Sequence, residues 1–237
     1  MSDALLRVRS LKAWYGRAQI LFDVDVEVGR GEVVALMGRN GAGKSTTFKA
    51  VMGLLERVEG EVMFRGGRLR GLEPFQIARL GLGYVPEDRR VFSELTVAEN
   101  LQVGRQPKRP EAPAWTAEKL FRVFPNLGGM LDRLGGRMSG GEQQMLTVAR
   151  TLMGNPLLLL LDEPSEGMAP KIVEEMADMI RELKKAGLSV LLSEQNLYFA
   201  HLVCDRAYVI EKGQVRHAGT MSELARNERV RRDYLSV

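Results

Sequence analysis

Residues 38–45 combine the residue types that hold a nucleotide phosphate. They read GRNGAGKS, which fits the pattern G-x-x-x-x-G-K-[ST] in full. The glycines let backbone N–H groups curl around phosphate oxygens, while Lys44 reaches the β- and γ-phosphates and Ser45 offers a hydroxyl to Mg²⁺. A chance glycine-rich turn is the alternative, but an apolar run precedes the motif and a helical run follows it. The residues expected to contact ATP here are Gly38, Arg39, Asn40, Gly41, Ala42, Gly43, Lys44, Ser45 and Thr46.

An acidic pair supplies the second half of a hydrolytic site. Residues 158–163 read LLLLDE, an apolar strand pattern that ends in Asp162 and Glu163. Asp162 is expected to hold the metal, directly or through water, and Glu163 to act on the water that attacks the γ-phosphate. Taken alone, an acidic strand end would be a helix cap or a solvated turn. Beside a phosphate loop it favours nucleotide hydrolysis, with Lys44 and Glu163 as catalytic residues.

A second candidate anion site opens a later helix. Residues 138–146 read MSGGEQQML, in which a serine and two glycines start an amphipathic segment. The N–H groups at the start of such a helix attract anions. Taken alone, Ser139 would be an ordinary N-cap. The residues assigned to this second site are Ser139, Gly140, Gly141 and Glu142.

The elements that must position these residues alternate between strands and helices. Apolar runs at 33–37, 157–161 and 189–192 predict buried strands, and each is followed by a helical pattern, at 46–52 and 171–185 among others. This alternation predicts an α/β fold with a mainly parallel sheet. The first 30 residues and 61–65 have strand character without helices between them, which predicts a small antiparallel sheet.

Residues 87–137 interrupt the alternation. They contain four prolines around two expected helices, at 97–103 and 117–124, and predict a helical insertion. The C-terminus is expected to end in a further helix.

Composition and charge indicate the location of the protein and the kind of partner it binds. The longest purely apolar run is five residues, 157–161, far short of the ~20 that span a bilayer, so a cytoplasmic location is expected. The chain has 34 basic and 30 acidic residues, a net charge of +4. Its basic residues are mixed with acidic and polar ones and match no DNA- or RNA-binding motif, so no nucleic-acid partner is expected.

The order of the three motifs resembles that of the ATP-binding cassette ATPases over nearly the whole chain. This resemblance implies a P-loop NTPase fold: a RecA-like core with a mainly parallel sheet, an antiparallel β subdomain and an α-helical subdomain. Residues 1–86 and 138–215 would form the nucleotide-binding core with the antiparallel subdomain, 87–137 the helical subdomain and 216–237 a C-terminal helical segment. It also implies that segment 139–142 completes a site on a second copy, across a dimer interface.

Other site residues are implied by the resemblance alone. Tyr15 falls where the family has an aromatic residue that stacks on adenine. In 83–87, GYVPE, the sequence has Glu87 where glutamine is usual, so Glu87 is expected near ATP and Mg²⁺. In 191–195, LLSEQ, Gln195 replaces the histidine that senses the γ-phosphate, and it is expected to donate to that phosphate as a catalytic residue. Ala169 stands where aspartate is common, which puts one cross-dimer contact in doubt.

The flanking residues are similar to one branch, the ATP-binding subunits of branched-chain amino acid importers. Segments 85–101, 167–170 and 193–196 carry this similarity. It implies a dimer with a second copy or a paralogous ATPase, a membrane permease, an indirect solute-binding partner and a peripheral place on the inner face of the cell membrane. Amide or urea importers, an exporter, and a soluble cassette acting on nucleic acid or ribosomes remain alternatives.

Overall fold

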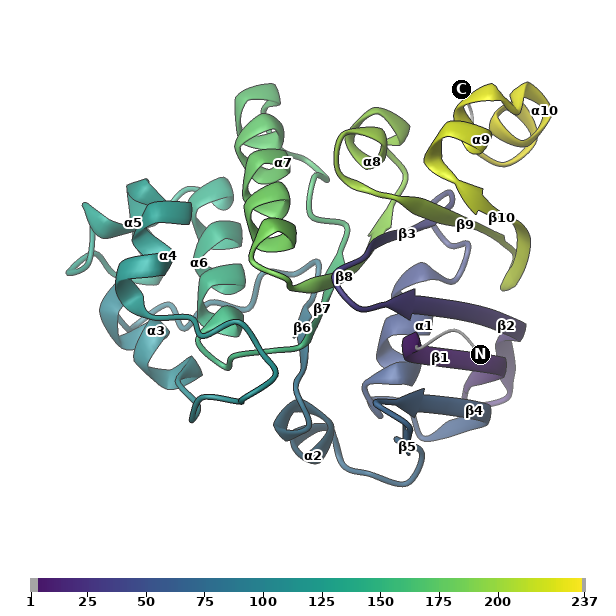
Figure 1. The fold of residues 1–237 in the computed structure, drawn as a ribbon, viewed down its shortest axis with the longest axis horizontal. Helices are drawn as coiled ribbons and strands as arrows, with labels where there is room; N and C mark the ends of the chain where they lie inside the picture. The colour runs from purple at the N-terminus through teal and green to yellow at the C-terminus, as the bar shows by residue number, and fades with distance from the viewer. Residues whose placement is uncertain (1–3, 236–237) are drawn as a thin grey trace.

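The computed structural model describes residues 4–235, which form two sheets surrounded by helices (Figure 1). In the six-stranded sheet, neighbouring strands from β9 to β6 are parallel, and β10 pairs antiparallel with β9. In their order across this sheet the strands are β10 (Gln214–Thr220), β9 (Arg206–Glu211), β3 (Val33–Met37), β8 (Ser189–Glu194), β7 (Leu158–Asp162) and β6 (Leu82–Val85).

The central strands are buried along their whole length. Every residue of β3, β7 and β8 is buried, because the sheet is covered on both faces. This explains why these strands appear in the sequence as continuous apolar runs without alternation. The strands expected at 33–37, 157–161 and 189–192 are confirmed within two residues at each end, as is the α/β fold with a mainly parallel sheet.

The four-stranded sheet is antiparallel, in the order β2-β1-β4-β5. Helix α1 (Lys44–Val51) belongs to the hydrophobic core that this sheet shares with the larger one, and Phe48 of α1 is fully buried there. The expected antiparallel sheet is confirmed, with longer strands than the sequence indicated. Its strands are β1 (Ala4–Tyr15), β2 (Ala18–Gly29), β4 (Arg57–Phe64) and β5 (Gly67–Arg68).

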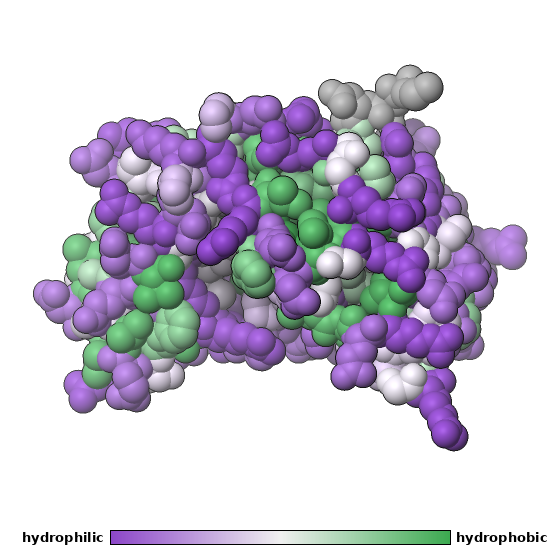
Figure 2. Space-filling model, turned by 90° about the horizontal axis from the view of Figure 1, so that it is seen from below, coloured by the Kyte–Doolittle hydropathy of each residue, from purple (hydrophilic) through white to green (hydrophobic). Residues whose placement is uncertain are grey.

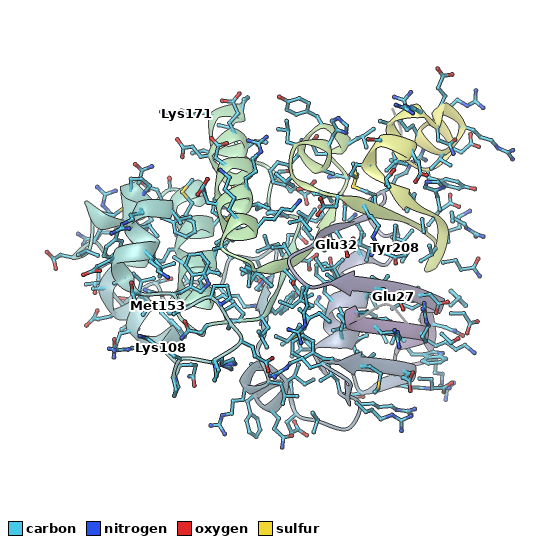
Figure 3. All side chains as sticks on the ribbon, viewed as in Figure 1. Glu27, Glu32, Lys108, Met153, Lys171 and Tyr208 are labelled. Atoms are coloured by element: carbon cyan, nitrogen blue, oxygen red, sulfur yellow. The ribbon has the colours of Figure 1, made fainter. Side chains whose placement is uncertain are left out.

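A polar network joins the two sheets. Figure 3 shows Glu27, Glu32 and Tyr208 close together where β2 meets β9. The Arg206 guanidinium donates to both carboxylate oxygens of Glu32, at 2.5 and 3.1 Å. The same group donates to the Glu27 carbonyl at 3.1 Å, and the backbone N–H of Glu27 donates to the Tyr208 hydroxyl at 3.1 Å. These bonds fix β2, which contacts the phosphate loop, against the parallel sheet.

The helices formed by residues 97–152 gather on the side of the molecule opposite the antiparallel sheet (Figure 1). Within 87–137 the two expected helices are present, as α3 and α4, and α6 packs on α3. The helices in this region are α3 (Val97–Gly104), α4 (Ala117–Val123), α5 (Pro125–Gly128), a 3₁₀ turn (Gly135–Arg137) and α6 (Gly140–Leu152). Elsewhere the chain forms α2 (Pro74–Arg79), α7 (Pro170–Lys185) and α8 (Leu197–Val203).

The C-terminal region differs from the expectation of a helical segment over 216–237. Residues 214–220 form strand β10, because their backbone pairs with β9 after a tight turn in which Lys212 and Gly213 have positive φ. Helical structure begins only with α9 (Met221–Arg226) and continues in α10 (Glu228–Val230) and a π-helical turn (Arg231–Leu235). Residues 1–3 and 236–237 of the expected segments lie outside the described part. Between residues 4 and 235 no helix is long and apolar enough to cross a membrane.

Candidate active site

The phosphate-loop motif joins β3 to α1, in the strand-to-helix context that it requires. A side chain at Gly38 would place its Cβ 2.4 Å from the carbonyl oxygen of Ile210. Gly43 has a φ of 111°, and a Cβ there would lie 2.8 Å from Leu21 of β2. Both positions therefore require glycine. Arg39, Asn40 and Gly41 form the exposed tip of the loop, and Ala42, Gly43 and Thr46 are buried beneath it.

Lys44 is the first residue of α1, and its ammonium group lies under the loop. Nζ donates to the carbonyl oxygens of Gly38 at 2.7 Å and Arg39 at 3.1 Å. It also lies 3.0 Å from Oε1 of Glu163. The Lys44 and Glu163 side chains are only 2% and 6% exposed. The structure thus places the two predicted catalytic residues in direct contact.

Glu163 has an unusual environment for a carboxylate. Burial and the neighbouring Glu166 carboxyl group raise the pKa of Glu163 to about 7, although Lys44 acts in the opposite direction. Its second oxygen, Oε2, is buried and has no hydrogen-bond partner in the described structure. A carboxylate with a pKa near neutrality and a free oxygen can accept a proton from water, which is the role predicted for Glu163.

Asp162, at the end of β7, is held by three hydroxyl groups. Ser45 of the phosphate loop donates to Oδ1 at 3.0 Å, and Ser193 donates to the same oxygen at 2.6 Å. Tyr84 donates to Oδ2 at 3.2 Å. The structure therefore brings together two of the three predicted metal ligands, Ser45 and Asp162, and their oxygens suit Mg²⁺.

Sequence analysis missed Tyr84 and Ser193. Both lie near the carboxyl ends of strands, β6 and β8, that flank β7 on its two sides. Ser193 also accepts a hydrogen bond from the backbone N–H of Glu163, at 2.9 Å. Ligand sites of parallel α/β sheets form at the carboxyl ends of the strands, so the strand order would have revealed both residues had it been known.

Glu87 is the third predicted metal ligand. It is exposed on a turn after β6, and no hydrogen bond links it to Ser45 or Asp162 in residues 4–235. No cluster of three acidic, histidine or cysteine side chains suited to a metal is found in the same residues. The turn that begins at Pro86, directly after β6, leaves the Glu87 side chain exposed, and its assigned role near ATP and Mg²⁺ stays a prediction.

Gln195 and Tyr15 both have exposed side chains. Gln195 follows β8, which lies between β3, the strand leading into the phosphate loop, and β7, the strand ending in Asp162. Tyr15 is 47% exposed at the end of β1, which is paired with β2. Each side chain is free to meet a ligand, and the assigned roles of both residues stay predictions.

Ser139 is the N-cap of α6. Its hydroxyl accepts from the Glu142 N–H at 3.4 Å, and the Glu142 carboxylate accepts from the Ser139 N–H at 2.7 Å, which is a capping box. A Cβ on Gly140 would lie 2.3 Å from the Arg89 guanidinium, and one on Gly141 would crowd Ile172. No hydrogen bond or ion pair in the described chain joins 139–142 to 38–46. The role assigned to 139–142 on a second copy stays a prediction.

Comparison with known proteins decides the family. The model of the ABC transporter family matches residues 21–166, which include the phosphate loop, segment 139–142 and the acidic pair. The chain belongs to the ABC transporter family. ATP hydrolysis is the activity expected of an ATP-binding cassette of this family. The family resemblance and the cassette fold predicted from the sequence are thereby confirmed.

Relatives of this cassette include an amino acid transport protein and a lipopolysaccharide export protein. It is 42% identical to the high-affinity branched-chain amino acid transport ATP-binding protein BraG of Pseudomonas aeruginosa, covering 98% of this chain and 99% of that one. It is 35% identical to the lipopolysaccharide export system ATP-binding protein LptB of Haemophilus influenzae, covering 98% and 97%. A solved ADP conformation of an ABC transporter cassette resembles it with a TM-score of 0.80 and 28% identity, covering 96% of each chain.

The cassette also has a groove of about 630 Å³ between α2, the end of α3, α6 and the segment that follows β6. Figure 2, which views the molecule from the side where α2 lies, shows apolar patches among hydrophilic side chains. The exposed apolar side chains that line the groove are Leu54, Phe75, Phe92 and Val103. Arg79 and Arg150 cover the rings of Phe75 and Phe92, at 5.4 and 4.8 Å from the ring centroids. Exposed apolar surface of this kind marks a site of protein contact.

Proposed function

We propose that this cassette binds ATP with Mg²⁺, hydrolyses it, and thereby powers import of branched-chain amino acids through a membrane permease. The observation that carries the proposal is the convergence of Lys44, Ser45, Asp162 and Glu163 at the carboxyl edge of the parallel sheet. A lysine and a ring of loop N–H groups suit a triphosphate, and the adjacent oxygens of Ser45 and Asp162 suit a divalent cation.

Glu163 is the general base in this proposal. It takes a proton from the attacking water. Lys44 gives up its contacts with the loop carbonyls and with Glu163 and binds the phosphates instead. General-base catalysis of this kind contributes about 10²–10⁴-fold to a rate. Gln195 donates a hydrogen bond to the γ-phosphate, and Tyr15 stacks on adenine.

Mg²⁺, when bound, neutralises charge on the β- and γ-phosphates. Ser45 and Asp162 would hold it, together with Glu87 of the turn after β6. The cassette works as a dimer, with a second copy or with a paralogous ATPase. Ser139, Gly140, Gly141 and Glu142 then meet the γ-phosphate on the other subunit, at the positive end of α6.

The apolar groove is where a cytoplasmic helix of the permease docks. Helix-in-groove contacts place an apolar helix face against exposed apolar side chains, as Phe75 and Phe92 provide here. The cassette then lies on the inner face of the cell membrane, and a solute-binding protein acts on the far side of the permease. Nucleic acid has no part in this function.

The choice of solute follows the likeness to BraG, 42% identical over 231 residues. Export is the second candidate function, because LptB is 35% identical over a similar span. Amide or urea import is a further variant of the first.

The mass in solution of the Glu163→Gln variant, with and without Mg-ATP, tests the proposal. The variant keeps the ATP site and lacks the base, so we expect ATP-dependent doubling of mass. A monomer that still binds ATP would require a different ATPase partner or the permease. Failure to bind ATP would contradict the proposed function itself. A Lys44→Ala, Glu163→Gln variant is the control, since it is expected neither to bind ATP nor to dimerise.

A further inference from the structure

Glu194, the last residue of β8, is a carboxylate that sequence analysis left without a role. It is 1% exposed. Its Oε1 accepts a hydrogen bond from the backbone N–H of Ser165 at 3.1 Å. Its Oε2 accepts from the backbone N–H groups of Gln195 and Asn196, each at 3.1 Å. One side chain thus binds the backbones of two loops of the site.

The backbone of Glu194 reaches a third loop. Its carbonyl oxygen accepts from the N–H of Gly38, the first residue of the phosphate loop, at 3.1 Å. The loop of Ser165 follows the acidic pair, and the loop of Gln195 carries the proposed γ-phosphate contact. Three loops that are far apart in sequence therefore meet at this single residue.

Burial of this carboxylate is unfavourable unless hydrogen bonds offset the loss of its hydration. No ion pair involves Glu194 in residues 4–235, and a buried charge without a cation is unfavourable. Burial raises the pKa of Glu194, and the Ser165 hydroxyl and the three N–H groups oppose this effect. A glutamine could serve only one of the two loops, because it has one acceptor oxygen and its NH₂ group would face the donors of the other.

We propose that Glu194 is a positioning residue that holds the Ser165 loop and Gln195 in register with the phosphate loop. The inference rests on the proposed function, because it assigns those two loops to the reacting end of ATP. Glu194 itself touches no phosphate. Its loss should lower kcat by misplacing Gln195 and the Ser165 loop, while the phosphate loop still binds ATP.

The test compares the wild type with Glu194→Gln and Glu194→Asp by amide hydrogen exchange and steady-state hydrolysis. In Glu194→Gln we expect exchange at least tenfold faster at Ser165 or at the Gln195 and Asn196 pair. We expect kcat at least tenfold lower, with KM for ATP changed less than threefold. Glu194→Asp keeps both oxygens on a shorter side chain, so its kcat should lie between those of the wild type and Glu194→Gln.

Glu223→Gln is the control, since Glu223 on α9 is a carboxylate that also accepts a backbone N–H, that of Thr220 at 2.7 Å, and takes no part in the site. It should leave those amides and kcat within twofold of wild type. Unchanged exchange and kcat in Glu194→Gln, or an equal loss of kcat and ATP affinity, would overturn the inference. If Glu194→Gln does not fold, Glu194→Asp decides, and wild-type exchange and kcat in that variant would also overturn it. A wild type that binds no ATP would instead contradict the proposed function.

Discussion

The ammonium group of Lys44 and the carboxylate of Glu163 form a buried ion pair, with 3.0 Å between Nζ and Oε1. Lys44 begins the helix after the phosphate loop, and Glu163 follows β7. Because the two side chains are in contact, a change in the group proposed to hold phosphate alters the environment of the group proposed to activate water.

Removing only Lys44 should destabilise the fold more than removing both partners. Lys44→Met leaves the Glu163 charge buried without a cation, which typically costs about 3–5 kcal/mol of the free energy of unfolding. Lys44→Met, Glu163→Gln removes that charge, so the double variant should be more stable than Lys44→Met at pH 8. Denaturant unfolding of the wild type, the two single variants and the double variant gives the coupling energy between Lys44 and Glu163. We expect it to be about 1–3 kcal/mol. Additive effects would show that the pair is not coupled.

Hydrolysis should depend on pH through Glu163. The pKa of about 7 means that the carboxylate loses its proton, and becomes a base, as the pH rises through 7. We expect kcat/KM to increase about tenfold per pH unit below 7 and to level off above it. The His201→Ala, His217→Ala double variant should keep the same profile, because Gln195 occupies the histidine position and cannot titrate. Loss of the pH dependence in that variant would assign it to a histidine.

Tyr84→Phe should weaken the response to Mg²⁺ without weakening ATP binding. The change removes the hydroxyl that donates to Oδ2 of Asp162 at 3.2 Å and leaves the ring in place. Loss of a hydrogen bond that orients a metal ligand typically costs about 10–100-fold in metal affinity. We therefore expect the half-saturating Mg²⁺ concentration to rise at least about tenfold, with unchanged ATP affinity in EDTA. Tyr198→Phe, at an exposed tyrosine, is the control and should match wild type.

The bond between Arg206 and Glu32 should stabilise the fold at neutral pH. Burial alone would raise the pKa of Glu32, but the hydrogen bonds from Arg206 and the Gly29 N–H lower it below its ordinary value of 4.5. A lowered carboxylate pKa contributes stability above about pH 4.5 that is lost as the pH falls through the folded-state pKa. Arg206→Met should therefore reduce the free energy of unfolding by about 1–3 kcal/mol at pH 7 and by less at pH 3.

Lys185→Gln provides the comparison for that prediction. Its exposed pair with Glu182 on α7 should contribute less than about 0.5 kcal/mol at either pH. Equal losses in the Arg206 and Lys185 variants would mean that the network between the sheets adds nothing beyond a surface ion pair.

The sequence determined the parts of the site that are local along the chain. The phosphate loop needs only a strand, four variable positions between glycines, a lysine and a helix, so residues 38–45 identified it directly. Neighbouring residues likewise set the bounds of β3 at 33–37, the acidic pair at the end of β7 and the cap of α6 at Ser139. Local periodicity and capping chemistry suffice for such features.

Only the tertiary structure decided which of these residues meet. Ser45 and Asp162 are 117 residues apart, and Tyr84 and Ser193 reach Asp162 from two further strands. The strand order that brings them together depends on packing across the whole sheet, which no local pattern records. The same packing pairs 214–220 with β9 as a strand, where a helical segment was expected. Residue types determined which chemical groups are present. The order of the parallel strands determined which of these groups lie together at the site.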